Sequence, residues 1–421
     1  MNLFEDYVPL VRKKRTPSKI KNSNSEISKN NVLPHTQAKL NLYKDYLGAY
    51  LSVLLRTPSV PKIYLYDIFC GNGVYDDGKP GSPVIALEII KKSVSDLIQS
   101  GKQTKPIYLI INDKSSKRLQ KARGILDNRN DGSCTIVSYN YDAEEMLQIT
   151  IKKLKESNKA DKTLIFIDPY GYSKIRKSII AQLMSFNNSE ILLFLPIAQM
   201  HRFSLAAQRL VNNSSFEPLR KFINEFLTNY DFKTRIDNYT KVFSFINAIK
   251  DAFTFQDKYF SCSHYIQRDV QNNFYALFFI TNHIYGLEKM LEAKWRLDTV
   301  SGDGFMLKDS SKLNQMSMFG DYHKSVESEF HEKFITKSLF EFMDGKLDVS
   351  NKEIYIFILK LGYLPVRISA ILKQLYGEGV IAITYSEMQK TKKISTYIGW
   401  KYFYDPPKVF YKLKQNGTIK Y

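Results

Sequence analysis

Residues 63–83 read IYLYDIFCGNGVYDDGKPGSP, and this stretch decides the fold. An apolar run rich in aromatic and β-branched residues ends at Asp67, and Gly71, Asn72 and Gly73 follow shortly afterwards. Such a run is typical of a buried strand, and two closely spaced glycines let the backbone turn sharply and approach a ligand. We therefore expect a strand that ends beside a binding site.

Four more short apolar runs follow along the chain, and segments with helical periodicity separate them. The five runs span residues 62–69, 106–113, 134–140, 163–171 and 190–198. Alternating strands and helices with near-continuous apolar strands are the pattern of a parallel sheet that is covered on both faces. The sequence predicts a doubly wound α/β sheet.

Two further strand-like runs, residues 259–268 and 273–282, have only DVQN between them. So short a link predicts an antiparallel hairpin, which we place at one edge of the sheet. Five alternating strands closed by an antiparallel pair favour a Rossmann-like methyltransferase sheet over a dehydrogenase sheet.

Length and composition divide the chain into parts. With 421 residues, it exceeds the size at which one hydrophobic core usually stops growing. In the C-terminal part, a helix, a turn, a second helix and a basic β-hairpin follow one another in the order of a winged helix. We expect a basic polar arm over residues 1–34, a Rossmann-like methyltransferase domain over 35–310 with a helical insertion at about 200–258, and a winged-helix-like α+β module over 320–421.

Charge points to the class of partner. The chain holds 61 Lys and Arg against 42 Asp and Glu, a formal net charge of +19. This excess favours a polyanion, first of all nucleic acid, although a composition that is merely basic is the alternative. No apolar run reaches the roughly 18 residues of a membrane span, and acids stand where a signal peptide carries bases, so we expect a cytoplasmic protein. The three cysteines and six histidines show no metal-ligand spacing, and we expect no metal.

The glycine loop does not fit a dinucleotide. A GxGxxG fingerprint needs a third glycine and an acid about 20 residues further on. Here Asp76 occupies the third position, and the next acid at a strand end is Asp113, 40 residues after Gly73. The pattern disfavours NAD.

Polar side chains instead follow three successive strands, whose carboxyl ends meet at one crevice. Asp67 can receive an ammonium group, Asp113 can accept two ribose hydroxyls, and Asp142 can meet an adenine amino group. This set suits S-adenosylmethionine, while aspartates that only form turns and caps are the alternative. The cofactor-binding residues that we expect are Asp67, Phe69, Gly71, Gly73, Asn112, Asp113 and Asp142.

The fourth strand ends in FIDPYG, residues 166–171. A carboxylate, a proline carbonyl and an aromatic ring can accept both hydrogens of an exocyclic amino group and stack on its base. Methyl transfer to such a nitrogen needs an aimed lone pair rather than a strong base. We expect Asp168, Pro169 and Tyr170 to be catalytic, with a simple Asp-Pro turn as the alternative. Since no cysteine follows a proline, methylation of a cytosine carbon is disfavoured.

Over roughly residues 35–300 these motifs resemble the three-Cys-motif partner (TcmP) proteins, which are methyltransferase-like. The likeness rests on HTQAKL, YLYDIFCGNGVYDDGKPGSPVIAL, FIDPYGYS, FLPIAQMHR and FYALFFITNH. It implies a Rossmann-like methyltransferase fold and a partner that looks like a radical S-adenosylmethionine-type three-cysteine protein. DPYG is also similar to the DPPY motif of amino-directed nucleic-acid methyltransferases, with one proline missing.

We therefore expect an S-adenosylmethionine-dependent methyltransferase that modifies an exocyclic amino group of a base in DNA or RNA. One alternative is a catalytically inactive methyltransferase fold that serves as a nucleotide sensor or as a partner-docking or nucleic-acid-binding module. A methyltransferase for small molecules or proteins is a third hypothesis. The nucleic-acid-binding residues that we expect in the C-terminal module are Arg367, Lys373, Lys390, Lys392 and Lys393.

Overall fold

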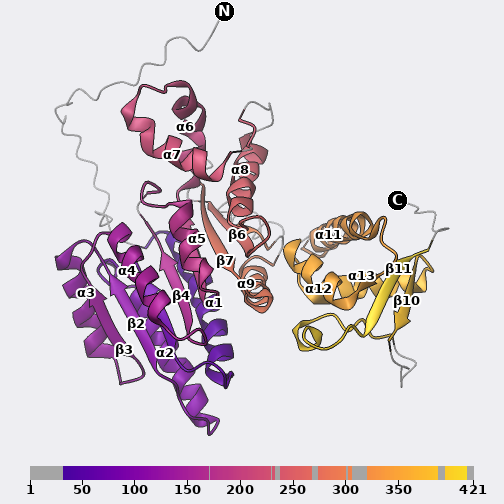
Figure 1. Ribbon diagram of the computed structural model, residues 1–421, viewed down its shortest axis with the longest axis horizontal. Helices are drawn as coiled ribbons and strands as arrows, with labels where there is room; N and C mark the ends of the chain where they lie inside the picture. Colours follow the sequence, from indigo (N-terminus) through magenta and orange to yellow (C-terminus); the bar gives the residue numbers. More distant parts are fainter. Residues whose placement is uncertain are drawn as a thin grey trace, which may run out of the picture.

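Figure 1 shows a computed structural model of the chain. It describes residues 32–169, 171–228, 230–232, 238–267, 274–299, 302–305, 320–386 and 394–414. Most of the expected N-terminal arm lies outside these ranges, as do Tyr170, Lys390, Lys392 and Lys393.

An eight-stranded sheet forms the centre of the larger domain, with the strand order β3-β2-β1-β4-β5-β7-β6-β8. The five strands at one side run parallel, whereas β7 is antiparallel to β5 and β6 is antiparallel to β7. The strands are β1 (Ile63–Asp67), β2 (Ile107–Asn112), β3 (Thr135–Tyr139), β4 (Lys162–Ile167), β5 (Ser189–Leu195), β6 (Phe260–Gln267), β7 (Phe274–Thr281) and β8 (Gly304–Phe305). This order and the antiparallel hairpin confirm the predicted Rossmann-like methyltransferase sheet.

Helices cover both faces of the sheet and enclose two apolar cores (Figure 1). One face carries α1 (Pro34–Arg56), α2 (Ser82–Gln99), α3 (Ser116–Arg129) and α9 (Ile284–Leu297). The other carries α4 (Ala143–Glu156) and α5 (Lys177–Ser185). In β1, Leu65 packs into the first core and Tyr66 into the second. Because β1, β2, β4 and β5 are buried on both faces, they read as continuous apolar runs in the sequence.

Helices also occupy the segment between β5 and β6. They are α6 (Ile197–Arg209), η1 (Ser214–Phe216), α7 (Glu217–Phe226) and α8 (Asn238–Ala252). Figure 1 shows α6 and α7 beyond the end of the sheet at which β5 leaves it. This is the carboxyl end of the parallel strands, where ligands bind in open α/β sheets.

In its described residues, the C-terminal module contains three α-helices, a 3-10 helix and a small sheet of order β10-β11-β9. Its elements are α11 (Gly320–Met343), β9 (Val349–Ser350), α12 (Asn351–Lys360), α13 (Pro365–Gly377), β10 (Ile381–Tyr385), η2 (Trp400–Tyr402) and β11 (Val409–Leu413). The helices α12 and α13 and the antiparallel pair β10 and β11 follow in the expected order, but residues 386–408 separate the two strands, and η2 lies where the second strand of the hairpin was expected. The winged-helix identity stays a prediction. In the described parts of the chain, no helix has the length and apolar character needed to cross a bilayer.

The module packs against α9 of the larger domain. The indole Nε1 of Trp295 donates a hydrogen bond to the carbonyl of Gly362, at 2.9 Å. The hydroxyl of Tyr355 donates to Glu288, and Trp400 stacks on Tyr285 with ring centroids 4.7 Å apart. The two parts of the chain therefore share a specific interface.

Candidate active site

The glycine loop after β1 is held in a conformation that its two glycines permit. Gly71 and Gly73 have φ of +59° and +80°, in the left-handed region. A Cβ atom on Gly73 would lie 3.1 Å from the Cα of Ala122 in α3, whereas one on Gly71 would meet nothing within 4 Å. Gly73 thus allows close packing of α3, and Gly71 leaves open space at the crevice.

Asp67 is the last residue of β1 and is 1% exposed. Its Oδ1 accepts a hydrogen bond from the backbone N–H of Phe69 at 3.3 Å, but its buried Oδ2 has no partner within the described chain. Burial raises the pKa of Asp67 to about 7, against the lowering effect of the Ser82 hydroxyl. A buried acceptor without a donor is costly, so this oxygen is suited to receive a ligand's N–H group.

Asp113 follows β2, and its carboxylate already accepts hydrogen bonds from the chain. One oxygen accepts from the backbone N–H of Ser115 at 2.7 Å and from Arg118 Nε at 3.1 Å. The other accepts from the backbone N–H of Gly71 at 3.2 Å. Arg118 Nη2 also lies 2.9 Å from the first oxygen, so Oδ1 is fully occupied by the chain. Oδ2 has two lone pairs and accepts one of these bonds, which leaves room for one hydroxyl rather than for a bidentate pair.

Asn112 was expected to bind the cofactor, but its amide serves the chain itself. Its Nδ2 donates to the carbonyls of Ile68 at 3.1 Å and Tyr141 at 3.2 Å. Its Oδ1 accepts from the backbone N–H of Tyr141 at 3.0 Å. Both donors are therefore used, and Asn112 positions the segments after β1 and β3. Asn140, which the sequence reasoning missed, adds to this by donating to the carbonyl of Asp113 at 2.7 Å.

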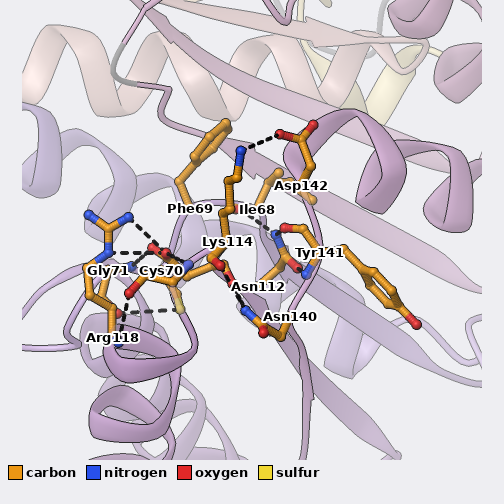
Figure 2. Close-up of polar contacts among 12 residues, drawn as sticks. Ile68, Phe69, Cys70, Gly71, Asn112, Lys114, Arg118, Asn140, Tyr141 and Asp142 are labelled. Atoms are coloured by element: carbon orange, nitrogen blue, oxygen red, sulfur yellow. Dashed lines mark hydrogen bonds and ion pairs between the residues drawn. The ribbon is translucent and has the colours of Figure 1, made fainter.

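Asp142 caps α4 and faces two lysines. It accepts from the backbone N–H of Glu144 at 3.1 Å, and its carboxylate lies 3.7 Å from the ammonium groups of both Lys114 and Lys174. The cap hydrogen bond, aided by the lysines, holds the pKa of Asp142 below its usual range. Figure 2 shows Lys114 reaching toward Asp142. The alternative of a capping aspartate is thus realised, and the carboxylate is still about one third exposed, with 32% side-chain exposure.

Asp168, directly after β4, forms an ion pair with Lys39 of α1. Lys39 is only 6% exposed, and its ammonium lies 4.6 Å from the ring centroid of Phe194. Asp168 raises and Lys39 lowers the pKa of Asp67, which places all three charged groups within electrostatic reach. Pro169 beside them is buried.

Lys39 is a site residue that the sequence reasoning missed. It lies four residues before Tyr43 on the buried face of α1, where a lysine is unusual. That position was the signal that could have identified it. His35, one turn earlier, stacks on Tyr275 at 5.4 Å, and Tyr275 stacks on Phe194 at 5.0 Å, so aromatic rings form one wall beside the pair.

The expected site residues therefore divide into three groups. Asp67, Gly71, Asp113, Asp142 and Asp168 meet at the carboxyl ends of β1 to β4, as the pattern predicted. Gly73 and Asn112 shape this region, and Phe69 packs against the core on the α4 face. The described residues hold no group of three or more His, Cys, Asp or Glu side chains arranged around a metal position.

The C-terminal candidates differ from one another. Lys373 is exposed on α13, as expected. Arg367 was expected to bind nucleic acid, but its guanidinium lies 4.4 Å from the ring centroid of Trp295 in α9. The cation–π contact places Arg367 in the interface with the larger domain.

No protein-family model and no curated protein matches the sequence. Solved structures with similar folds include the bifunctional kinase-methyltransferase WbdD, with 9% identity over 58% of this chain and 39% of that one, at a TM-score of 0.30. Another is an O-methyltransferase from Bacillus cereus in complex with SAH (11% identity, 60% and 84% coverage, TM-score 0.31). A third is magnesium protoporphyrin IX methyltransferase from Synechocystis (7% identity, 60% and 90% coverage, TM-score 0.28). At such scores the fold assignment rests on the strand order and connectivity of this chain.

Proposed function

We propose that this protein is an S-adenosylmethionine-dependent methyltransferase that acts on an exocyclic amino group of a nucleic-acid base. The observation that carries the proposal is the position of Asp67. Its unpartnered, buried oxygen lies at the carboxyl end of β1, where the strand order reverses between β1 and β4. In open α/β sheets this switch point is the ligand crevice.

The donor set of this crevice fits S-adenosylmethionine. Asp67 would receive the ammonium of the methionine part, and the open space at Gly71 would admit the ligand close to the backbone. Asp113 would accept one ribose hydroxyl beside its bond to Arg118, and Asp142 would meet the adenine amino group. The three strand ends thus offer one acceptor each for the ammonium, a ribose hydroxyl and the adenine amino group of this cofactor.

The residues after β4 would orient the acceptor. Asp168 and the carbonyl of Pro169 would accept the two hydrogens of the amino group, which aims the nitrogen lone pair without removing a proton beforehand. S-adenosylmethionine, when bound, would supply a methyl group: the nitrogen lone pair would form the new N–C bond, the C–S electron pair would stay on sulfur, and one N–H proton would leave to water. Tyr170 is proposed to stack on the base and lies outside the described residues.

Charge near the crevice supports a polyanionic substrate. The side chains of Lys114 and Lys174 are 79% and 49% exposed beside Asp142, and Lys373 is exposed on the C-terminal module. Together with the net charge of +19, these groups would concentrate DNA or RNA at the surface. Lys390, Lys392 and Lys393 are proposed to add phosphate contacts.

The motif resemblance supports two further proposals. We place the chain among the three-Cys-motif partner proteins, and we expect a partner that looks like a radical S-adenosylmethionine-type three-cysteine protein. Co-purification of the two proteins after co-expression tests this, and separate elution at micromolar concentration contradicts it.

A catalytically silent methyltransferase fold is the second candidate. It is favoured by the occupation of two key carboxylates by cations of the chain, Asp113 by Arg118 and Asp168 by Lys39. Such a protein would bind a nucleotide ligand and change its interaction with a partner in response, without transferring a methyl group.

The deciding experiment has a binding arm and an activity arm. Calorimetry with S-adenosylmethionine and S-adenosylhomocysteine should show binding by the wild type and its loss in Asp67→Ala. Tritiated methyl groups should enter cellular DNA or RNA with the wild type and not with Asp168→Ala. Binding without transfer to any nucleic acid would select the silent fold, and no binding of either ligand would overturn the cofactor assignment.

A further inference from the structure

Lys39 and Asp168 form the ion pair in the candidate site, and their burial is unequal. The side chain of Lys39 is 7% exposed and that of Asp168 is 23% exposed. Lysine is almost never fully buried unless it is paired, and here Oδ2 of Asp168 and the face of Phe194 surround the ammonium. The pair therefore keeps its cation inside and presents its carboxylate to the crevice.

The packing of its helix also fixes the position of Lys39. It lies in α1, a helix of 23 residues that packs against α2 and α9 within the first apolar core. Tyr43, one turn further on, stacks on Phe166 of β4 with ring centroids 4.4 Å apart. The helix and the strand that carry the two charges are thus fixed to each other by packing, which limits the rotamers of the pair.

We propose, resting on the proposed function, that Lys39 is a positioning residue that occupies one carboxylate oxygen of Asp168 and leaves the other to the substrate. In this way it selects an N–H donor as the methyl acceptor. Lys39 occupies Oδ2, and Oδ1 is left to accept one hydrogen of the acceptor. A neutral amino group can donate that hydrogen bond. A carbonyl oxygen, a carboxylate or a phenolate cannot, and its lone pairs would face the carboxylate of Asp168.

Removal of the charge should separate positioning from cofactor binding. Lys39→Met keeps the length and apolar stem of the side chain but frees Asp168 to rotate, and displacement of an orienting group costs on the order of 100-fold in rate. We expect kcat for methyl transfer to fall by about that factor, while calorimetric affinity for S-adenosylhomocysteine stays unchanged. Lys39→Arg should restore much of kcat, because a guanidinium also pairs with a carboxylate.

Lys44→Met is the matched control, since Lys44 lies on the same helix and is exposed. It should leave kcat, affinity and melting temperature unchanged. If Lys39→Met lowers the melting temperature but the folded enzyme keeps the wild-type kcat, the residue is only structural and the proposal fails.

A binding measurement tests acceptor selection without any activity. In saturating S-adenosylhomocysteine, saturation-transfer NMR should detect deoxycytidine and deoxyadenosine but not the 2′-deoxynucleosides of pyrimidin-2-one and purine, in which hydrogen replaces the amino group and the base carries no N–H donor. Lys39→Met should weaken the binding of the amino nucleosides about tenfold, and Lys39→Arg should not. If the wild type shows this pattern of nucleoside binding but transfers no methyl group, the proposed activity is contradicted and the inference about Lys39 stands. Equal binding of the nucleosides with and without the amino group would overturn the inference, and the tritium assay would still test the activity.

Discussion

The carboxylate of Asp113 accepts a hydrogen bond from the backbone N–H of Gly71, at 3.2 Å, and so joins the end of β2 to the glycine loop after β1. The same carboxylate holds Arg118 in the first turn of α3, with Nη2 at 2.9 Å. Asp113 is 3% exposed, so these bonds are sheltered from water. One side chain thus sets the shape of the loop and the position of a neighbouring cation.

Asp113→Ala should weaken binding of S-adenosylhomocysteine by about 1–3 kcal/mol, the cost of leaving buried polar groups unpaired. The loss has two sources, because the variant removes one acceptor for the ribose and frees the N–H of Gly71. Calorimetry measures the affinity, and Asp131→Ala, an exposed aspartate after α3, is the control that should bind normally. Wild-type affinity in Asp113→Ala would remove this residue from the cofactor site.

Asp67 should make the ligand-free protein less stable at alkaline than at acidic pH. Its pKa is raised from 3.8 to about 7 by burial, so between about pH 4 and 7 the folded state keeps a proton that the unfolded state has released. The free energy of unfolding therefore declines as pH rises through this window. Asp67→Asn, which cannot ionise, should therefore stabilise the protein more at pH 8 than at pH 5, by a difference on the order of 1–3 kcal/mol.

Denaturant unfolding at the two pH values measures this effect. Asp142→Asn is the control. Because the pKa of Asp142 is lowered, the folded state prefers its ionised form, and this variant should destabilise the protein by about the same amount at pH 5 and pH 8. An equal change in stability for Asp67→Asn at pH 5 and pH 8 would contradict an Asp67 that is protonated in the folded state.

Cofactor affinity should depend on the same proton. Asp67 must be ionised to hold an ammonium group, so binding below pH 7 releases a proton from its carboxyl group. The dissociation constant should fall as pH rises from 5.5 to 7, by at most about tenfold per pH unit. Calorimetry in buffers of different ionisation enthalpy counts the released protons. A wild-type protein that releases none at pH 6 would place the ammonium group elsewhere.

The sequence could predict the sheet and the strand ends, because both follow from local patterns. Continuous apolar runs marked the strands, and the short link between β6 and β7 indicated their antiparallel pairing. Asp67 and Asp168 could be placed at one crevice because Asp67 ends β1 and Asp168 directly follows β4, and these two strands proved parallel. These features depend on neighbours in the chain.

The partners of these side chains could not be predicted, since they come from distant segments. Lys39 is 129 residues from Asp168, and no spacing rule relates a helix before β1 to the end of β4. Arg367 lies over Trp295 of a different domain, and a pattern of polar positions in α13 says nothing about which helix faces it. Long-range packing decides such pairs.

The salt dependence of nucleic-acid binding should distinguish Arg367 from the lysines of the C-terminal module. Each lost phosphate contact lowers the slope of log affinity against log salt by about 0.9 on duplex or about 0.7 on single strands. The exposed Lys373 should show such a change in Lys373→Ala, and alanine at Lys390, Lys392 and Lys393 together should lower the slope by about 2–3. Arg367→Ala should instead keep the slope, because its guanidinium is placed on Trp295, and should cost about 0.5–2 kcal/mol of stability.

Fluorescence anisotropy with a labelled duplex and a labelled single strand, titrated with KCl, gives the slopes, and thermal unfolding gives the stabilities. An unchanged slope in both lysine variants would assign the module to a protein partner, because the electrostatic signature of phosphate binding would then be missing from its exposed cations.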